Sequence, residues 1–197
     1  MIEAPPTHHG SQRPVAAIDG ATVWVTLSGP VGGRTVIMLE DSDRNSTAQD
    51  GVRERLQVAM FRTVSVPVHD GLSAKSIIGV LDQLRITGGL LVGDGAGAEL
   101  AWDLAAGHRG RFTGLVAIDC GHPGVPDADG IIREKDCPPV EVDTTILVGG
   151  RSAHAVARAS RRHVHGDFRL VDVAGPRNSR HFTAQLATEI VMRALSR

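Results

Sequence analysis

Short blocks of hydrophobic residues, separated by polar turns, run through this chain of 197 residues. Near the amino terminus, residues 14–18 and 21–27 are brief runs of the strand type, and Asp19-Gly20 stands between them, a sequence typical of β-hairpin turns. Residues 35–39 are almost continuously apolar, as in a strand that is buried on both faces. The pattern therefore predicts a hairpin followed by a central strand.

From residue 47 onward, segments with helical spacing alternate with short apolar strands. Helices are expected at residues 47–59, 73–84, 96–106, 153–162 and 183–195, and strands at residues 63–68, 90–92, 115–118, 145–148 and 168–173. A hairpin followed by repeated strand–helix units predicts an α/β fold, with a doubly wound, mostly parallel sheet of about eight strands. A single domain is expected at residues 14–197, after a flexible polar tail at residues 1–13.

Composition narrows the class of protein. Apolar residues make up 42% of the chain but aromatic residues only 3%, which argues against an aromatic-lined ligand cage. No segment approaches the roughly 18 to 20 apolar residues of a membrane-spanning helix, and the first residues do not resemble a signal peptide. Cys120 and Cys137 are too few for a disulfide framework. We therefore expect a cytoplasmic protein with no membrane or nucleic-acid partner.

Charge is unevenly distributed along the chain, although the net charge is only −1. Residues 1–144 carry 12 basic and 19 acidic groups, whereas residues 145–197 carry 9 and 3. A solvated basic helix around Arg158, Arg161 and Arg162 explains this difference, and a site for an anionic ligand or partner is the alternative. Arginine outnumbers lysine by 19 to 2, so a single arginine carries little weight in the prediction.

The most informative motif is the run at residues 89–97, Gly-Leu-Leu-Val-Gly-Asp-Gly-Ala-Gly. An apolar strand leads into a Gly-x-Nu-x-Gly turn, in which Nu is the position of a nucleophile, and an alanine-rich helix follows. In enzymes with the motif G-x-S-x-G, the central serine lies on a strained strand-to-helix turn that presents its Oγ to the substrate. The central residue here is Gly95, so the motif has the outline of a nucleophile elbow without a nucleophile.

With its flanking segments, this motif resembles the α/β-hydrolase family over nearly the whole chain. The similar segments are residues 17–24 and 28–30 (the family's first hairpin), 35–39 (the strand before the oxyanion loop), 91–97 (the elbow) and 101–112 (the helix after it and its exit). The resemblance implies an α/β-hydrolase-like fold in one domain. Because only about 25 residues separate the strands at 115–118 and 145–148, the helical cap that is usual in the family is expected to be absent.

The resemblance also implies where catalytic groups should lie, and the sequence departs from the family there. The oxyanion loop reads Glu40-Asp41-Ser42, and carboxylates oppose the negative charge that develops at an oxyanion. The turn that usually holds the catalytic acid contains Ser152, while Asp119 lies one strand earlier, where some members carry the acid.

The catalytic histidine is replaced by Pro176 when the sequences are aligned without gaps. A short insertion brings His181 to that position instead, although a surface or helix-capping role is the alternative for this side chain. Gly95, Ser152 and Pro176 therefore mark the degenerate positions of the triad.

Other residues could carry chemistry in place of the triad. Asp94 would be the nucleophile of an epoxide-hydrolase-like enzyme if the turn were displaced by one residue. Cys120, His122 and Cys137 could ligate a metal, but one Cys-x-His pair and a distant cysteine form a weak pattern. We expect neither a metal nor a cofactor.

Two functions from different classes follow. In the first, the protein has lost its Ser-His-Asp triad and binds a small molecule or partner without catalysis, at the carboxyl ends of the strands. That crevice is expected to contain Glu40, Asp41, Ser42, Gly95 and Ala96.

In the second, the protein is a hydrolase of esters, lactones or epoxides with a displaced site. Its reacting group would be Asp94 or Ser42, with His181 as base and Asp119 as its orienting acid. In either case, an open face without a cap could also support a homodimer.

Overall fold

The computed structural model describes residues 10–18, 20–41, 46–69 and 71–196. Ser42 and residues 1–9 of the expected tail lie outside these ranges. The strands are β1 (Ser11–Ala16), β2 (Thr22–Ser28), β3 (Thr35–Asp41), β4 (Arg62–Val68), β5 (Gly89–Asp94), β6 (Phe112–Ile118), β7 (Thr144–Val148) and β8 (Phe168–Asp172). The helices are α1 (Ser46–Val58), α2 (Ala74–Gln83), α3 (Ala96–Gly107), α4 (Arg151–Ser160) and α5 (Arg180–Leu195), with a 3₁₀ turn at Arg161–His163.

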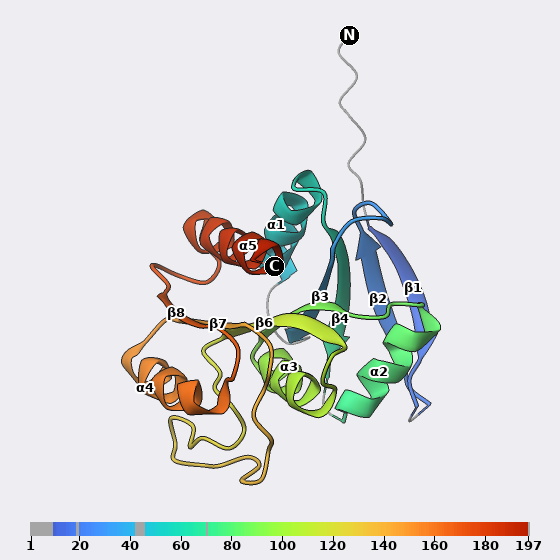
Figure 1. Ribbon diagram of the computed structural model, residues 1–197. Coiled ribbons are helices and arrows are strands. Elements are labelled where there is room, and N and C mark those ends of the chain that lie inside the picture. The colour runs from blue at the N-terminus through green and yellow to red at the C-terminus, as the bar shows by residue number, and fades with distance from the viewer. Residues whose placement is uncertain (1–9, 19, 42–45, 70, 197) are drawn as a thin grey trace.

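The strands form one sheet in the order β1-β2-β4-β3-β5-β6-β7-β8 (Figure 1). β1 and β2 form an antiparallel hairpin, β2 is antiparallel to β4, and the other neighbours are parallel. The predicted mostly parallel sheet of about eight strands is therefore confirmed. β1 begins three residues earlier than expected, because Ser11 pairs with Leu27 and Arg13 with Val25. These residues belong to the sheet, and not to a loose tail.

Helices cover both faces of the sheet (Figure 1). α1 and α5 pack on one face, over a core that includes Met38, Leu56 and Ile190. α2, α3 and α4 lie on the other face, where Trp102 is fully buried. The central strands are covered on both sides, which explains why their sequences are apolar at successive positions and do not alternate.

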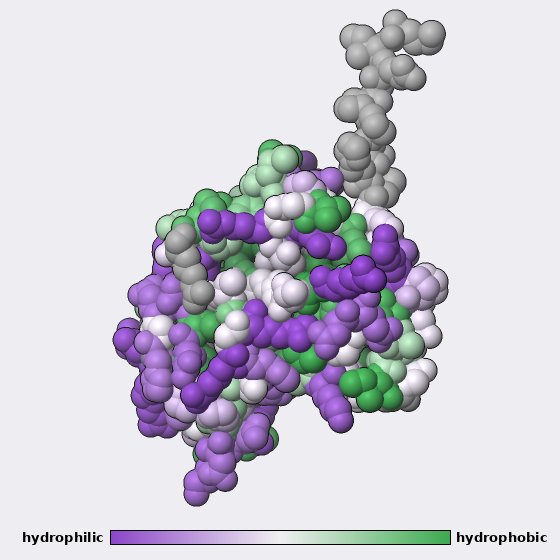
Figure 2. Space-filling model, turned by 45° about the vertical axis from the view of Figure 1, so that its right-hand side comes forward, coloured by the Kyte–Doolittle hydropathy of each residue, from purple (hydrophilic) through white to green (hydrophobic). Residues whose placement is uncertain are grey.

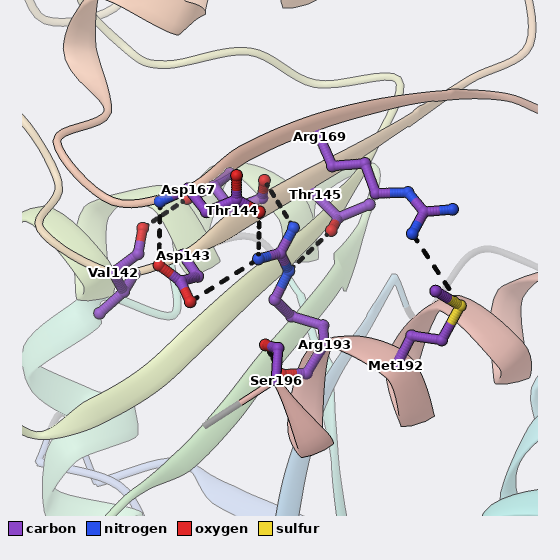
Figure 3. A network of polar contacts seen from close by, with 9 residues as sticks. All are labelled: Val142, Asp143, Thr144, Thr145, Asp167, Arg169, Met192, Arg193 and Ser196. Carbon is purple, nitrogen blue, oxygen red and sulfur yellow. Dashed lines mark hydrogen bonds and ion pairs between the residues drawn. The ribbon is translucent and has the colours of Figure 1, made fainter.

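A buried arginine attaches the end of α5 to the beginning of β7 (Figure 3). Arg193 is 7% exposed, and its Nε donates a hydrogen bond to Thr145 Oγ1 at 2.9 Å. Its Nη1 donates to Asp167 Oδ2 at 3.0 Å and lies 3.8 Å from Asp143 Oδ2. The start of α5 lies at the opposite edge of the sheet, where the parallel strands end, and it is therefore the end of the helix that reaches the candidate site.

Residues 119–143 connect β6 to β7 without forming a helix, so the predicted absence of a helical cap is confirmed. His122, which is 1% exposed, anchors this segment. The Gly124 N–H donates to its Nδ1 at 3.1 Å, and its Nε2 hydrogen bonds to the Pro138 carbonyl at 3.0 Å. The ring also stacks on His163, with centroids 4.3 Å apart. These contacts give His122 a structural role.

Hydrophilic side chains cover most of the face shown in Figure 2, and hydrophobic ones form small separate patches. Ile18 and Trp24 are among the large apolar side chains that are more than half exposed. Among the described residues, no helix combines the length and the apolar character needed to cross a membrane.

Candidate functional site at the carboxyl edge of the sheet

The turn between β5 and α3 has the backbone of a nucleophile elbow. Gly95 caps α3 with φ 57° and ψ −129°, a backbone conformation that residues with a Cβ adopt only with strain. The two flanking glycines allow a close approach of the backbone. A Cβ on Gly93 would overlap Gly97 and Ala98, and one on Gly97 would overlap the carbonyl oxygen of Leu39. The helix therefore starts close against β3 and β5, as the motif predicts.

Asp119 follows β6 and lies beside this turn. Its φ of 49° is in the left-handed region, which aspartate tolerates better than most residues. The Gly149 N–H, at the end of β7, donates a hydrogen bond to Asp119 Oδ1 at 2.6 Å. The turn after β7, which in the family usually holds the acid, instead fixes the carboxylate that comes from one strand earlier.

Arg177 lies in the turn between β8 and α5 and bridges two carboxylates. Its Nη1 donates to Asp94 Oδ1 and its Nη2 to Asp119 Oδ2. Burial by itself would lower the pKa of Arg177, but the two carboxylates outweigh burial and raise the pKa above its ordinary value. This guanidinium is therefore a permanent cation. It donates to one carboxylate at the end of β5 and to one in the turn after β6.

Two cavities flank the Asp94–Arg177 pair, which lines both of them. The first, of about 230 Å³, lies between the ends of β3 and β5 and the helices α1 and α5. The second, of about 400 Å³, lies between α3, α4 and the segment after β6, and it is lined by Gly95, Asp119 and Ser152 among others. The elbow therefore opens onto the second cavity, on the α3 and α4 side.

Glu40, at the end of β3, lines the first cavity and is held by α1. Arg53 Nη1 donates to Glu40 Oε1 at 2.6 Å and to Ser65 Oγ at 3.3 Å. Burial raises the pKa of Glu40, and the nearby Arg53 offsets part of this effect. The carboxylate is therefore built into the wall of the cavity and is not a solvated loop residue.

The remaining predicted residues are spread around the elbow. Ala96 is exposed at the first position of α3, and Asp41 is partly buried at the end of β3. Neither residue is among those lining the two cavities, and Ser42 lies outside the described residues. Pro176 is exposed next to Arg177. His181 is exposed in the first turn of α5 and lines neither cavity.

The cysteines show no sign of catalytic or metal chemistry. Burial raises the pKa of Cys120 to about 12 and that of Cys137 to about 11, so both are thiols at neutral pH. Within the described part of the chain, no group of three or more histidine, cysteine or acidic side chains could hold a metal ion.

Sequence reasoning missed Arg177, the side chain that joins the site together. The family pattern assigns the position of the catalytic base to its neighbour Pro176 or to the later His181, and in a chain with 19 arginines a single arginine carries little weight. The available signal was position: the residue follows the last strand, directly after the turn Gly175-Pro176, at the edge of the sheet where the elbow lies.

The strand order, the elbow and the helices on both faces define the α/β-hydrolase fold. Among solved structures, the chain is similar to a dienelactone hydrolase from Anabaena variabilis, with 21% identity and a TM-score of 0.74 over 95% of this chain and all of that one. It is also similar to epoxide hydrolase A from Mycobacterium thermoresistibile, with 11% identity and a TM-score of 0.72 over 94% of this chain and 98% of that one. No protein-family model and no curated protein sequence matches the chain. At these identities the likeness establishes the fold.

Proposed function

We propose that this protein binds a small molecule at the carboxyl edge of its sheet and has lost the hydrolytic chemistry of its fold. The observation that carries the proposal is Arg177, which lies ion-paired between Asp94 and Asp119 beside an elbow with glycine at its centre. The binding crevice includes Glu40 and Gly95 of the predicted set, and its best-defined space is the pair of cavities that Arg177 separates.

The chemical groups at the site support binding without hydrolysis. Acyl transfer by the triad requires a nucleophile, a base within hydrogen-bond reach of it, and an acid that orients the base. Gly95 offers no nucleophile, and the group that joins the elbow to Asp119 is a guanidinium. Arginine stays protonated at any physiological pH and cannot accept a proton from an attacking hydroxyl.

The competing function is a hydrolase of esters, lactones or epoxides with a displaced site at Asp94, Asp119 and His181. Arg177 holds both carboxylates in ion pairs, so one oxygen of each is already engaged by a guanidinium N–H. His181 is exposed on α5, outside the cavities that contain the two aspartates. The arrangement favours binding over catalysis.

An assay with short-chain aryl esters, lactones and epoxides tests the proposal. We expect the wild-type protein to show no turnover above the buffer rate for any of these substrates. Turnover that disappears in Asp94→Asn or His181→Ala, while the melting temperature stays within a few degrees of the wild type, would overturn the proposal and establish the displaced site.

A further inference from the structure

The cavity between β3, α1 and α5 is shaped for a small apolar group. Most of its wall is hydrocarbon, from the side chains of Met38, Leu39, Val52, Val92, Phe182 and Leu186. Its volume of about 230 Å³ exceeds that of an apolar cavity of roughly 150 Å³, which is enough to bind benzene. Glu40, Asp94 and Arg177 supply its charged groups. This cavity fits one ring or a short chain attached to a polar head.

The charges around both cavities select the sign of that head. The described lining residues include the carboxylates of Glu40, Asp94, Glu99, Asp119 and Asp127, and the guanidinium groups of Arg133 and Arg177. Arg53 pairs with Glu40 from behind the wall and Arg133 with Glu99, so these five carboxylates still exceed the three guanidinium groups beside them. A concave surface with an excess of one charge attracts ligands of the opposite charge and repels those of the same charge.

We infer that the cleft binds a small organic cation, in which an amidinium, guanidinium or ammonium head is attached to an apolar group. The apolar group fills the cavity between α1 and α5, and the head lies between Asp94 and Asp119, where the Arg177 guanidinium is found. This inference rests on the proposed binding function and specifies its ligand.

Arg177 acts in this scheme as an internal occupant of the cation site. Its ion-pair partners among the described residues are Asp94 and Asp119, and its side chain is 35% exposed. It extends from a turn whose other residues, including Pro176 and Asn178, are largely exposed. A tethered group competes with a free ligand at an effective concentration in the millimolar range. Removing the guanidinium should therefore strengthen the binding of an external cation.

The alternative is an anionic ligand, for which removal of the Arg177 guanidinium should weaken binding. Arg177 would then be the group that recognises the ligand, and its loss would abolish binding. The two pairs with Asp94 and Asp119 oppose this possibility, since both Nη atoms of Arg177 already donate to these carboxylates, which an approaching anion would meet beside the guanidinium.

Calorimetric titration with benzamidinium, benzamide and benzoate separates these cases, because the three probes share one size and shape and differ in charge. They are titrated into the wild type, Arg177→Ala, Arg177→Gln and the control Arg158→Ala, which removes an exposed arginine of α4. We expect benzamidinium to bind both Arg177 variants at least about tenfold more tightly than the wild type and the control. Benzamide and benzoate should bind each of the four proteins more weakly than benzamidinium binds the Arg177 variants.

Tighter binding of benzoate to the wild type, lost in both Arg177 variants, would overturn the inference in favour of an anion site. Binding of none of the probes to either variant, with thermal unfolding showing that at least one is folded, would also overturn it. None of the probes is an ester, lactone or epoxide, so these outcomes are independent of the hydrolase assay that tests the proposed function.

Discussion

Gly95 keeps the backbone of a catalytic turn while lacking its side chain. Its φ of 57° and ψ of −129° are unfavourable for any residue with a Cβ, by about 1–3 kcal/mol. Glycine visits this region freely, so a glycine at this position avoids the strain that a residue with a Cβ would carry there. Asp119, at the position of the acid in some members of the family, is held by the Gly149 N–H, and Arg177 bridges it to Asp94.

This geometry predicts that two substitutions are needed to build a triad on the elbow. Gly95→Ser alone lacks a base, and Arg177→His alone lacks a nucleophile. The double variant supplies both missing groups, a hydroxyl at position 95 and an imidazole at position 177, the position from which Arg177 contacts Asp119. Because a general base contributes about 10²–10⁴-fold to such reactions, we expect aryl-ester turnover about a hundredfold above either single variant. The measurement is initial rates with p-nitrophenyl acetate.

The control for this prediction is the triple variant in which Asp119→Asn removes the acid that orients the imidazole, and its activity should fall close to that of the single variants. Equal activity in the double variant and Gly95→Ser would show that position 177 does not face the elbow.

Gly97 illustrates how tightly the turn is packed, and Gly107 at the other end of α3 provides a matched control. A Cβ on Gly97 would overlap the Leu39 carbonyl oxygen, whereas one on Gly107 would meet no atom within 4 Å. We expect Gly97→Ala to destabilise the protein by about 1–3 kcal/mol or more, since backbone must move. Gly107→Ala should be neutral or stabilise by up to about 1 kcal/mol. Urea unfolding monitored by circular dichroism measures both, and similar values for the two variants would contradict the packing argument.

For single residues, the sequence predicts a place in the site where that place follows from the spacing to a motif or to an apolar strand. Gly95 could be predicted from the Gly-x-Nu-x-Gly spacing, and Asp119 from its position after an apolar strand. Arg177 could not, because its role depends on three segments that only the folded sheet brings together: the ends of β5, β6 and β8. Nothing local distinguishes it from the other 18 arginines.

Among the elements, α5 is attached by charge as well as by apolar packing. Arg193 is 4% exposed at its side chain and contacts Thr145, Asp143 and Asp167 (Figure 3). Removing one partner of a buried ion pair leaves the other charge unpaired and costs about 3–5 kcal/mol. Because the Asp167 side chain is 71% exposed and that of Asp143 26% exposed, water solvates both carboxylates in part. We therefore expect Arg193→Met to destabilise the protein by about 1–3 kcal/mol, as measured by urea unfolding.

The matched control is Arg109→Met. Arg109 pairs with Glu141 at 2.8 Å, but both side chains are about half exposed. Surface pairs of this kind contribute about 0–1 kcal/mol. A loss of equal size in the two variants would mean that burial does not determine what these ion pairs contribute.

The hydrophobic pattern predicts where each helix and strand lies, but it does not predict the exact residue at which each one begins or ends. The predicted helix at residues 183–195 begins at Arg180, because the Ser179 side chain accepts a hydrogen bond from the Phe182 N–H and caps the helix. This shift puts His181 inside the first turn of α5. The helix predicted at residues 73–84 begins at Ala74, because Ser73 caps it: the Ser73 Oγ accepts a hydrogen bond from the Ser76 N–H at 3.1 Å.

In the folded molecule, the basic carboxyl-terminal part of the chain forms ion pairs with the acidic part that precedes it. The basic residues 145–197 supply Arg177 and Arg193, which pair with Asp94, Asp119 and Asp143 from the acidic part of the chain. The arginines around residue 158, which the sequence predicted to be solvated, are exposed. The homodimer expected from an open, cap-less face stays a prediction, which sedimentation velocity can test.

The stability of the whole domain should decrease in mild acid because of two histidines. Burial lowers the pKa of His122 and of His163, which stack on each other. The unfolded chain therefore binds protons at a higher pH than the folded protein. It follows that the stabilising effect is complete above about pH 6.5 and is lost as the pH falls through the folded-state pKa values.

We expect the free energy of unfolding to fall between about pH 7 and 5.5, by at most about 1.4 kcal/mol per pH unit for each histidine. In His122→Gln, whose amide can keep both hydrogen bonds, part of this slope should disappear. Burial raises the pKa of Glu40, an effect of the opposite sign that is common to both proteins and cancels in the difference. Urea unfolding at a series of pH values measures the slopes. Equal slopes in the two proteins would mean that His122 is protonated to the same extent in the folded and unfolded states.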